Sequence, residues 1–424
     1  MSTALLRPIG FRPWEISQLV NTPVIQYHAG EAAFLWMQRN HAVQAPHFRL
    51  KHLAKLDRRL EGHLEGLRLG AATAWNAAQN QLENCDMGTV FVISYLAFHS
   101  RDAKKMRSAV LLGLSAPEFQ TALLAALNWI DFKDLREVID QLKVSPEPRH
   151  QLVALSVATA HRIDPGSFLQ QTLGSDSPEL RARALRSIGE LKRTDLLPAV
   201  QYAERDADAT CRFWAGYAMA LLGDPQGAQI ALDAALAEPS LMYRGIEVAM
   251  RCGNANWARD ILRRLASENA SPRFAIKAAG ALGDPSLVPW LFSHMQNTAQ
   301  ARVAGEAFSM ISGADLDYLS LKQDAPEDAP EEELEEDDAQ DADLPWPDVD
   351  NVSKWWGSES NKFSAGQRYL AGHQASAASA MIVLREGYQR QRRSAAIEFA
   401  YSNAQAIVFP VAGRADWQRQ RLSA

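Results

Sequence analysis

Five glycines in the middle of the chain recur at a nearly constant interval. They are Gly189, Gly223, Gly253, Gly283 and Gly313. Their spacing of about 30 residues is typical of arrays in which a pair of helices is repeated along the chain. One such pair cannot bury its own apolar face, so successive pairs have to stack on each other. The spacing therefore predicts a helical repeat scaffold.

The residues that follow two of these glycines indicate how one helix leads into the next. Glycine readily adopts the left-handed conformation that ends a helix. An aspartate then caps the free N–H groups of the following helix, and a proline fits its first turn. The two clearest junctions are Gly223-Asp224-Pro225 and Gly283-Asp284-Pro285. We interpret all five glycines as junctions between helices.

Two helices in ~30 residues match the short HEAT-like class of repeat. The predicted fold class is therefore all-α: a HEAT-like α-solenoid with an N-terminal helical cap and a small C-terminal helical region. We expect an extended lead-in and the cap over residues 1–114, and the solenoid over residues 115–313. An acidic, disordered linker over residues 314–353 and the C-terminal helical region over residues 354–424 follow.

The predicted N-terminal cap contains one strongly patterned helix. Its leucines recur at steps of three and four, with charged residues between them, which indicates a helix with one apolar face. These leucines are Leu50, Leu53, Leu56, Leu60, Leu64 and Leu67.

The charge of the chain is distributed unevenly. The net charge is −6, but residues 324–350 hold fourteen Asp or Glu and no Lys or Arg, while the rest has 36 acidic and 44 basic residues. A segment this acidic and this poor in apolar groups cannot offset its ordering entropy by burial. It is open to three interpretations: a solvating linker, a cover for basic surface of the same chain, or a mimic of a nucleic-acid backbone. The same charges would repel DNA itself, so we expect no direct binding of nucleic acid.

Two kinds of residue in and after this segment are candidates for a partner interface. Carboxylates in a row attract a cationic groove, and exposed tryptophans are frequent anchors of interfaces. The candidates are Glu331, Glu332, Glu333, Glu335, Glu336, Asp337, Asp338, Trp346, Trp355 and Trp356.

Two further groups of residues have more than one interpretation. Trp214 lies among apolar residues, which favours a place in the repeat core over a binding role. Arg385, Arg390, Arg392 and Arg393 fall on one predicted helix at about 375–403. They form a solvated helix face, contact phosphate or an acidic partner, or pair with the acidic segment of the same chain.

The sequence offers no recognisable catalytic or cofactor-binding motif. Metal-protease, hydrolase, phosphate-loop and dinucleotide signatures are all missing, so we expect neither enzymatic activity nor a metal or cofactor. The three cysteines lack metal-ligand spacing. No apolar run approaches the ~18 residues of a membrane span, and the first residues lack the apolar core of a secretory signal. We expect a cytoplasmic protein without a membrane contact.

Nine segments of the chain carry a resemblance to a known family. They are residues 31–36, 45–70, 211–224, 279–291, 303–318, 344–348, 355–356, 366–372 and 390–400. In these segments the chain resembles a bacterial family of HEAT-like repeat proteins that is often encoded in type VI secretion clusters. It is similar to the immunity protein of a nuclease effector of the GHH type.

The resemblance implies a protein partner, namely a type VI secretion nuclease effector. We expect the chain to neutralise this toxin by covering its active site or its DNA-binding cleft. An alternative is a cytosolic adaptor that holds an effector for loading onto the secretion apparatus. A more remote alternative is a HEAT-like DNA glycosylase. The missing catalytic motif and the negative net charge argue against it.

Overall fold

The fold is all-α, as the sequence predicts. The computed structural model describes residues 21–267, 272–326 and 341–423. The chain divides into two compact units, Met1–Asn40 with Lys55–Leu135, and His41–Ala54 with Arg136–Ala424. The four boundaries expected from the sequence follow a different division of the chain and remain predictions.

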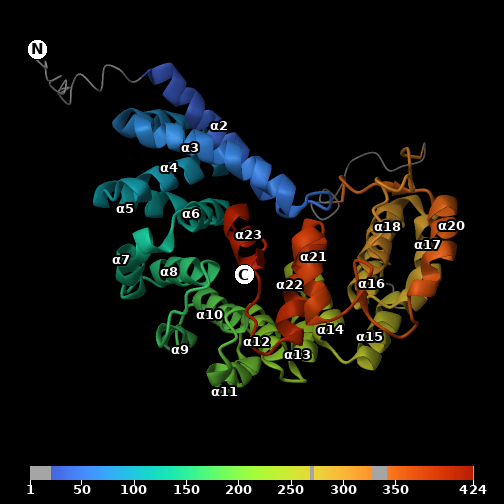
Figure 1. The fold of residues 1–424 in the computed structure, drawn as a ribbon. Helices are drawn as coiled ribbons and strands as arrows, with labels where there is room; N and C mark the ends of the chain where they lie inside the picture. Colours follow the sequence, from blue (N-terminus) through green and yellow to red (C-terminus); the bar gives the residue numbers. More distant parts are fainter. Residues whose placement is uncertain (1–20, 268–271, 327–340, 424) are drawn as a thin grey trace, which may run out of the picture. The chain divides into compact units, whose positions relative to one another are not determined.

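The first unit is a group of helices around a central buried one. Its elements are most of α2 (Thr22–Ala42), most of α3 (Leu50–Gln79), η1 (Asn80–Asn84), α4 (Met87–Ser100), α5 (Ala103–Gly113), α6 (Pro117–Trp129) and the start of α7 (Phe132–Lys143) (Figure 1). Helix α4 is buried on all sides from Gly88 to Phe98, and Phe91 on it stacks on Trp36 with ring centroids 4.9 Å apart. Five of the six patterned leucines are buried, while Leu56 is half-buried. The apolar stripe thus lies where its period predicts.

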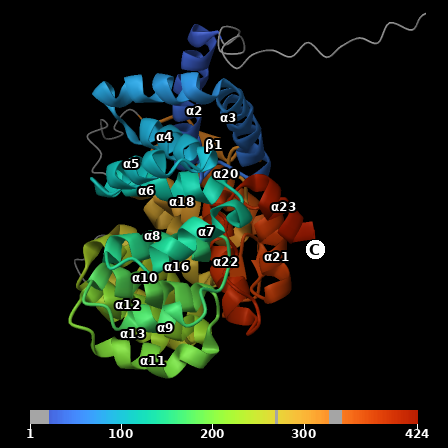
Figure 2. The same cartoon turned by 90° about the vertical axis from the view of Figure 1, so that its left-hand side faces the viewer.

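The second unit contains the repeat array. Helices that alternate along the sequence form one row, in which each packs on the next. This row is α8 (Pro148–Ala160), α10 (Pro178–Glu190), α12 (Ala209–Leu222), α14 (Met242–Cys252), α16 (Pro272–Leu282) and α18 (Thr298–Ser312). The intervening helices pack on this row (Figure 2), and short 3-10 turns lie between some of the helices. These are α9 (Phe168–Leu173), η2 (Thr194–Leu196), α11 (Leu197–Tyr202), η3 (Ala203–Arg205), α13 (Gly227–Leu236), η4 (Pro239–Leu241), α15 (Ala255–Ser267), η5 (Pro285–Leu287) and α17 (Val288–Met295).

The periodic glycines have more than one structural role. Gly223, Gly283 and Gly313 have φ of 91°, 76° and 73°, the left-handed conformation expected after a helix. Gly253 ends α14 with an extended backbone instead. The interpretation of Gly189 as a junction is wrong, because it lies inside α10. A Cβ there would come within 2.8 Å of the Ala218 Cα, so Gly189 allows two helices to approach closely.

The aspartates and prolines of the two junctions also differ. Asp284 caps η5 by accepting a hydrogen bond from the Ser286 amide, and Pro285 is the first residue of that turn. Asp224 accepts from the Gln226 amide. The prediction that Pro225 is the first helical residue is wrong, because a turn separates Pro225 from the start of α13.

After the array, the chain returns along it within the same unit. The elements are β1 (Lys322–Gln323), β2 (Trp346–Pro347), α20 (Val349–Glu359), η6 (Ser360–Lys362), β3 (Tyr369–Leu370), β4 (His373–Gln374), α21 (Ala377–Glu386), α22 (Gln389–Ser402) and α23 (Ala415–Ser423). Both strand pairs are antiparallel. Helix α22 contacts α12 and α14, and α20 contacts α17.

The single helix predicted near residues 375–403 is in fact two. Gly387 ends α21 with an extended backbone. The Tyr388 amide then donates to the Gln391 Oε1 atom at 3.0 Å, which satisfies a free N–H group at the start of α22.

Candidate protein-interaction surface

The two ends of the acidic segment lie side by side in the second unit. Strand β1 ends just before the segment and β2 lies within its last part, and the two pair antiparallel with Gln323 opposite Trp346. The predicted interface residues Glu331, Glu332, Glu333, Glu335, Glu336, Asp337 and Asp338 lie outside the described residues. What the structure shows is that the segment begins and ends at one place on the array.

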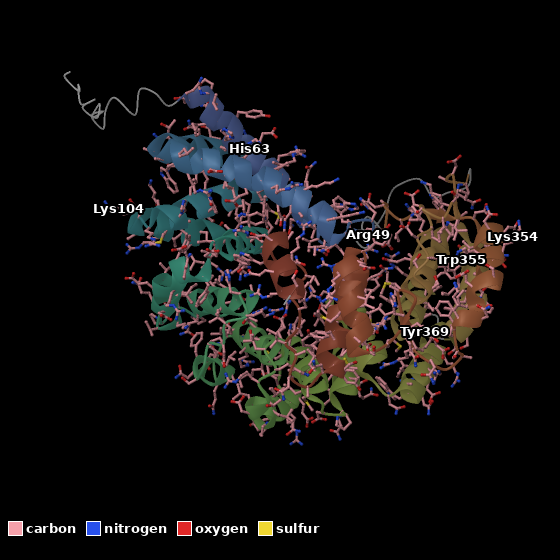
Figure 3. All side chains as sticks on the ribbon, in the orientation of Figure 1. Arg49, His63, Lys104, Lys354, Trp355 and Tyr369 are labelled. Atoms are coloured by element: carbon pink, nitrogen blue, oxygen red, sulfur yellow. The ribbon has the colours of Figure 1, made fainter. Side chains whose placement is uncertain are left out.

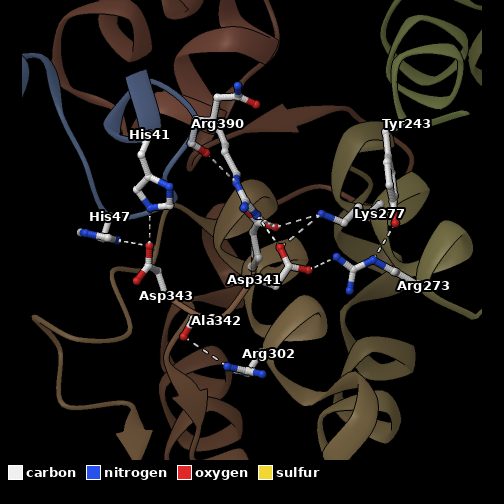
Figure 4. Close-up of polar contacts among 12 residues, drawn as sticks. His41, His47, Tyr243, Arg273, Lys277, Arg302, Asp341, Ala342, Asp343 and Arg390 are labelled. Atoms are coloured by element: carbon white, nitrogen blue, oxygen red, sulfur yellow. Dashed lines mark hydrogen bonds and ion pairs between the residues drawn. The ribbon is translucent and has the colours of Figure 1, made fainter. Parts of the chain in front are cut away.

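Asp341 anchors the acidic segment in a cationic cluster (Figure 4). Its carboxylate forms ion pairs with Arg390 at 2.8 Å, with Lys277 at 3.7 Å and with Arg273. Only 3 % of the residue is exposed. Burial raises the pKa of Asp341, but the charges of Lys277, Arg390 and Arg273 outweigh it and hold the pKa below its usual range. Glu306 also accepts from Arg390, at 2.8 Å, and completes the cluster.

The next two residues are held more loosely. The Ala342 carbonyl accepts a hydrogen bond from Arg302 at 3.2 Å. The Asp343 carboxylate lies 3.2 Å from the Nε2 atom of His41 and 3.8 Å from the Nδ1 atom of His47 (Figure 4). Since these three side chains are well exposed, we expect their contacts to contribute little to stability.

A cavity of about 710 Å³ lies beside the base of the acidic segment. Five carboxylates line it, against one lysine, one arginine and two histidines. The carboxylates belong to Glu306, Asp315, Asp317, Asp324 and Asp343. The lining is acidic on balance, although Asp315, Asp317 and Glu306 already pair with Arg49, Lys322 and Arg390.

The three candidate tryptophans pack against the second unit. Trp346 in β2 lies under the Arg302 guanidinium, with 4.8 Å between the Cζ atom and the ring centroid. Trp355 and Trp356 on α20 both meet the Phe308 ring edge-on at 5.8 Å. Figure 3 labels Trp355 on this helix. All three are half-buried, so they hold the returning chain on the array, and their role in an interface stays a prediction.

The arginines of the C-terminal helices have separate roles. Arg390 pairs with the acidic segment, as one of the three interpretations held. Arg392 is fully buried and donates to the Leu384 carbonyl at 2.8 Å. Arg385 and Arg393 are exposed, and Arg385 donates to the Leu422 carbonyl at 2.8 Å. The interpretation as one solvated face is therefore wrong, because Arg390 and Arg392 are taken up inside the second unit.

The remaining interpretations of single residues concern the core. Trp214 is 8 % exposed and lies edge-on to Phe213 and Tyr217, so it fills the repeat core. Cys211 and Cys252 are buried free thiols, and burial is the main cause that raises the pKa of each to about 12.

Among the described residues, no group of His, Cys, Asp or Glu could hold a metal ion. No helix in the described part of the chain is long and apolar enough to span a membrane.

The comparison with protein families supports the repeat assignment. Residues 166–251 match the family model for HEAT repeats. No curated protein and no solved structure matches the chain. The matched segment runs from the start of α9 almost to the end of α14, the middle of the array. A HEAT-like array presents a long concave surface, which suits a protein-interaction scaffold.

The Asp341 cluster could have been found in part from the sequence. Arg273 of this cluster donates to the Tyr243 hydroxyl at 2.6 Å, and Arg302 donates to the Ala342 carbonyl next to Asp341. Tyr243, Arg273 and Arg302 follow each other at about one repeat length, so the repeat period places them at equivalent positions of neighbouring repeats. Asp341 itself gave no signal, because one aspartate among fourteen acidic residues cannot be singled out by composition.

Proposed function

We propose that this protein is an immunity protein, which binds a nuclease toxin of a type VI secretion system and covers its active site or DNA-binding cleft. The protein would act without catalysis, in the cytoplasm, where the DNA substrate of the toxin lies. The type of toxin follows from the family resemblance described above. The structure supports a more general claim, that of a HEAT-like interaction scaffold with an acidic element fixed to it.

The observation that carries the proposal is the anchoring of the acidic segment at both ends. Residues 327–340 contain nine Asp or Glu, between Gln323 in β1 and Asp341 in its cationic cluster. Fixing both ends restricts the conformations open to the residues between them, which lowers the entropy lost on binding. A free linker between two domains would need no such anchors.

The charge of this region matches that of a nuclease cleft. A nuclease must present cations to bind DNA phosphates, and a row of carboxylates attracts the same cations and speeds encounter. The acidic lining of the neighbouring cavity could receive an Arg or Lys side chain from the partner.

Co-expression with a GHH-type nuclease from the same gene neighbourhood tests the proposal. We expect the intact chain to protect the cells and to form a complex with the catalytically inactivated nuclease that survives size exclusion. Replacing the seven candidate carboxylates between residues 331 and 338 with their amides should reduce protection. A stable complex without protection would favour the adaptor function instead, and absence of both would refute the proposal.

A further inference from the structure

Cationic and aromatic residues alternate with the period of the repeat along the row of helices that includes α10, α12, α14 and α16. Arg244 on α14 comes one repeat period after Trp214 on α12, and its Cζ atom lies 5.6 Å from the centroid of that ring. Arg273 on α16 comes one period after Tyr243, and its Cζ atom lies 5.8 Å from the centroid of the Tyr243 ring. A cation from each repeat thus lies against an aromatic ring of the repeat before it, which holds the guanidinium in place.

The positive charge along this row exceeds the negative charge around it. On α10, Glu190 is the common partner of Arg186 at 2.7 Å, Arg162 at 3.3 Å and Arg183 at 3.5 Å. The buried Nε atom of Arg183 has no hydrogen-bond partner among the described residues. One carboxylate therefore faces three guanidinium groups.

Two exposed arginines add further positive charge to this row. Within the described part of the chain, Arg244 and Arg393 have no carboxylate at ion-pair distance. Arg186 and Arg244 lie against the same ring, with their Cζ atoms 4.7 and 5.6 Å from the centroid of Trp214. Partial desolvation of the Arg244 guanidinium and the like charges of Arg186 and Arg393 lower its pKa to about 10, although Glu247 acts in the opposite direction.

The other end of the same row already holds a carboxylate. Asp341 is bound there by Arg273, Lys277 and Arg390. A cavity of about 150 Å³ adjoins this cluster. Arg393 lines it together with those three cations, which outnumber the two carboxylates of the lining, Glu247 and Glu306. The row is thus a carboxylate-binding surface of which one end is filled by the chain itself.

We propose that the open end of this row, formed by Arg186, Arg244 and Arg393 around Trp214, binds an acidic peptide segment of a protein partner. Planar guanidinium groups that rest on a ring can bind carboxylates through two hydrogen bonds each. The way Asp341 is held shows that side-chain carboxylates fit this surface. This site is separate from the acidic segment of the nuclease proposal, and either can fail without the other.

A fluorescein-labelled peptide of eight glutamates tests the inference by fluorescence polarisation with the purified full chain. The variant Arg244→Glu/Arg393→Glu reverses two exposed charges. The control Arg205→Glu alters an arginine on η3 whose side chain is 84 % exposed. We expect the intact chain and the control to bind alike, and the double variant to bind at least about tenfold more weakly at low salt. A peptide of eight glutamines should not bind.

A second variant, Arg244→Gln/Arg393→Gln, removes both charges without reversing them and should also weaken binding. Circular dichroism and thermal melting verify that each variant is folded. Equal binding of the peptide to the intact chain and to both double variants would overturn the inference. So would tighter binding of an eight-residue oligothymidylate than of the glutamate peptide, because the surface would then recognise nucleic acid.

Discussion

The Asp341 cluster makes the anchoring of the acidic segment measurable. Asp341→Asn keeps the shape of the side chain but removes the charge that faces Arg273, Lys277 and Arg390. Removing one partner of a buried ion pair costs ~3–5 kcal/mol when the other is left alone. Here Arg390 and Lys277 retain Glu306, at 2.8 and 3.6 Å. We therefore expect a smaller loss, about 2–3 kcal/mol of the free energy of unfolding.

Guanidinium chloride unfolding followed by tryptophan fluorescence measures this loss as a lower midpoint. Asp343→Asn is the matched control, because Asp343 lies two residues away and, within the described residues, its ion-pair partners are two exposed histidines. We expect the control to lose less than about 0.5 kcal/mol. If Asp341→Asn were no more destabilising than Asp343→Asn, the anchoring by charge would be refuted.

The same cluster predicts a dependence on pH. The pKa of Asp341 is lowered in the folded state, so the carboxylate contributes its full stability above the unfolded value of about 3.9. That contribution is lost as the pH falls through the folded value. The difference in stability between the intact chain and Asp341→Asn should therefore shrink below about pH 4, and a constant difference would contradict the assignment.

Three further outcomes follow from the packing and burial of single residues in the two units. Gly283→Ala should lower the unfolding midpoint far more than Gly223→Ala, because both have positive φ but only at Gly283 would a Cβ lie 2.0 Å from a backbone oxygen; equal losses would contradict this packing. Glu190→Gln should destabilise the chain at neutral pH by about 3 kcal/mol or more, since three arginines lose their shared partner, and unfolding curves measure it. Cys85 should react first with a thiol reagent under native conditions, because it is half-buried and the other two thiols are buried; mass spectrometry of the labelled peptides checks the order.

The repeat scaffold could be predicted because its signals are local. The leucine stripe after Leu50 and the left-handed glycines depend on neighbours a few residues away, which a sequence displays directly. The prediction of a junction at Gly189 is wrong because glycine has two uses in such an array: it ends a helix, or it allows two helices to touch. Its period does not distinguish them, since both recur once per repeat.

The anchoring of the acidic segment could not be predicted, because it depends on pairings distant in sequence. Asp341 is 68 residues from Arg273 and 49 from Arg390. Composition favours a solvating linker for such a segment, while the position of its anchors depends on how the returning chain packs on α16 and α18. A resemblance to immunity proteins indicated a partner, but not the surface that binds it.

The rate of association with an inactivated GHH-type nuclease, measured by stopped-flow fluorescence at two salt concentrations, tests the central claim most directly. The test variant carries amides at the seven candidate positions between residues 331 and 338. A control exchanges Glu for Asp and Asp for Glu there, which preserves the charge. We expect the control to associate like the intact chain, and the amide variant at least about tenfold more slowly at low salt, with a weaker dependence on salt. Identical rates and salt dependence for all three proteins would contradict the claim that the acidic segment binds the toxin.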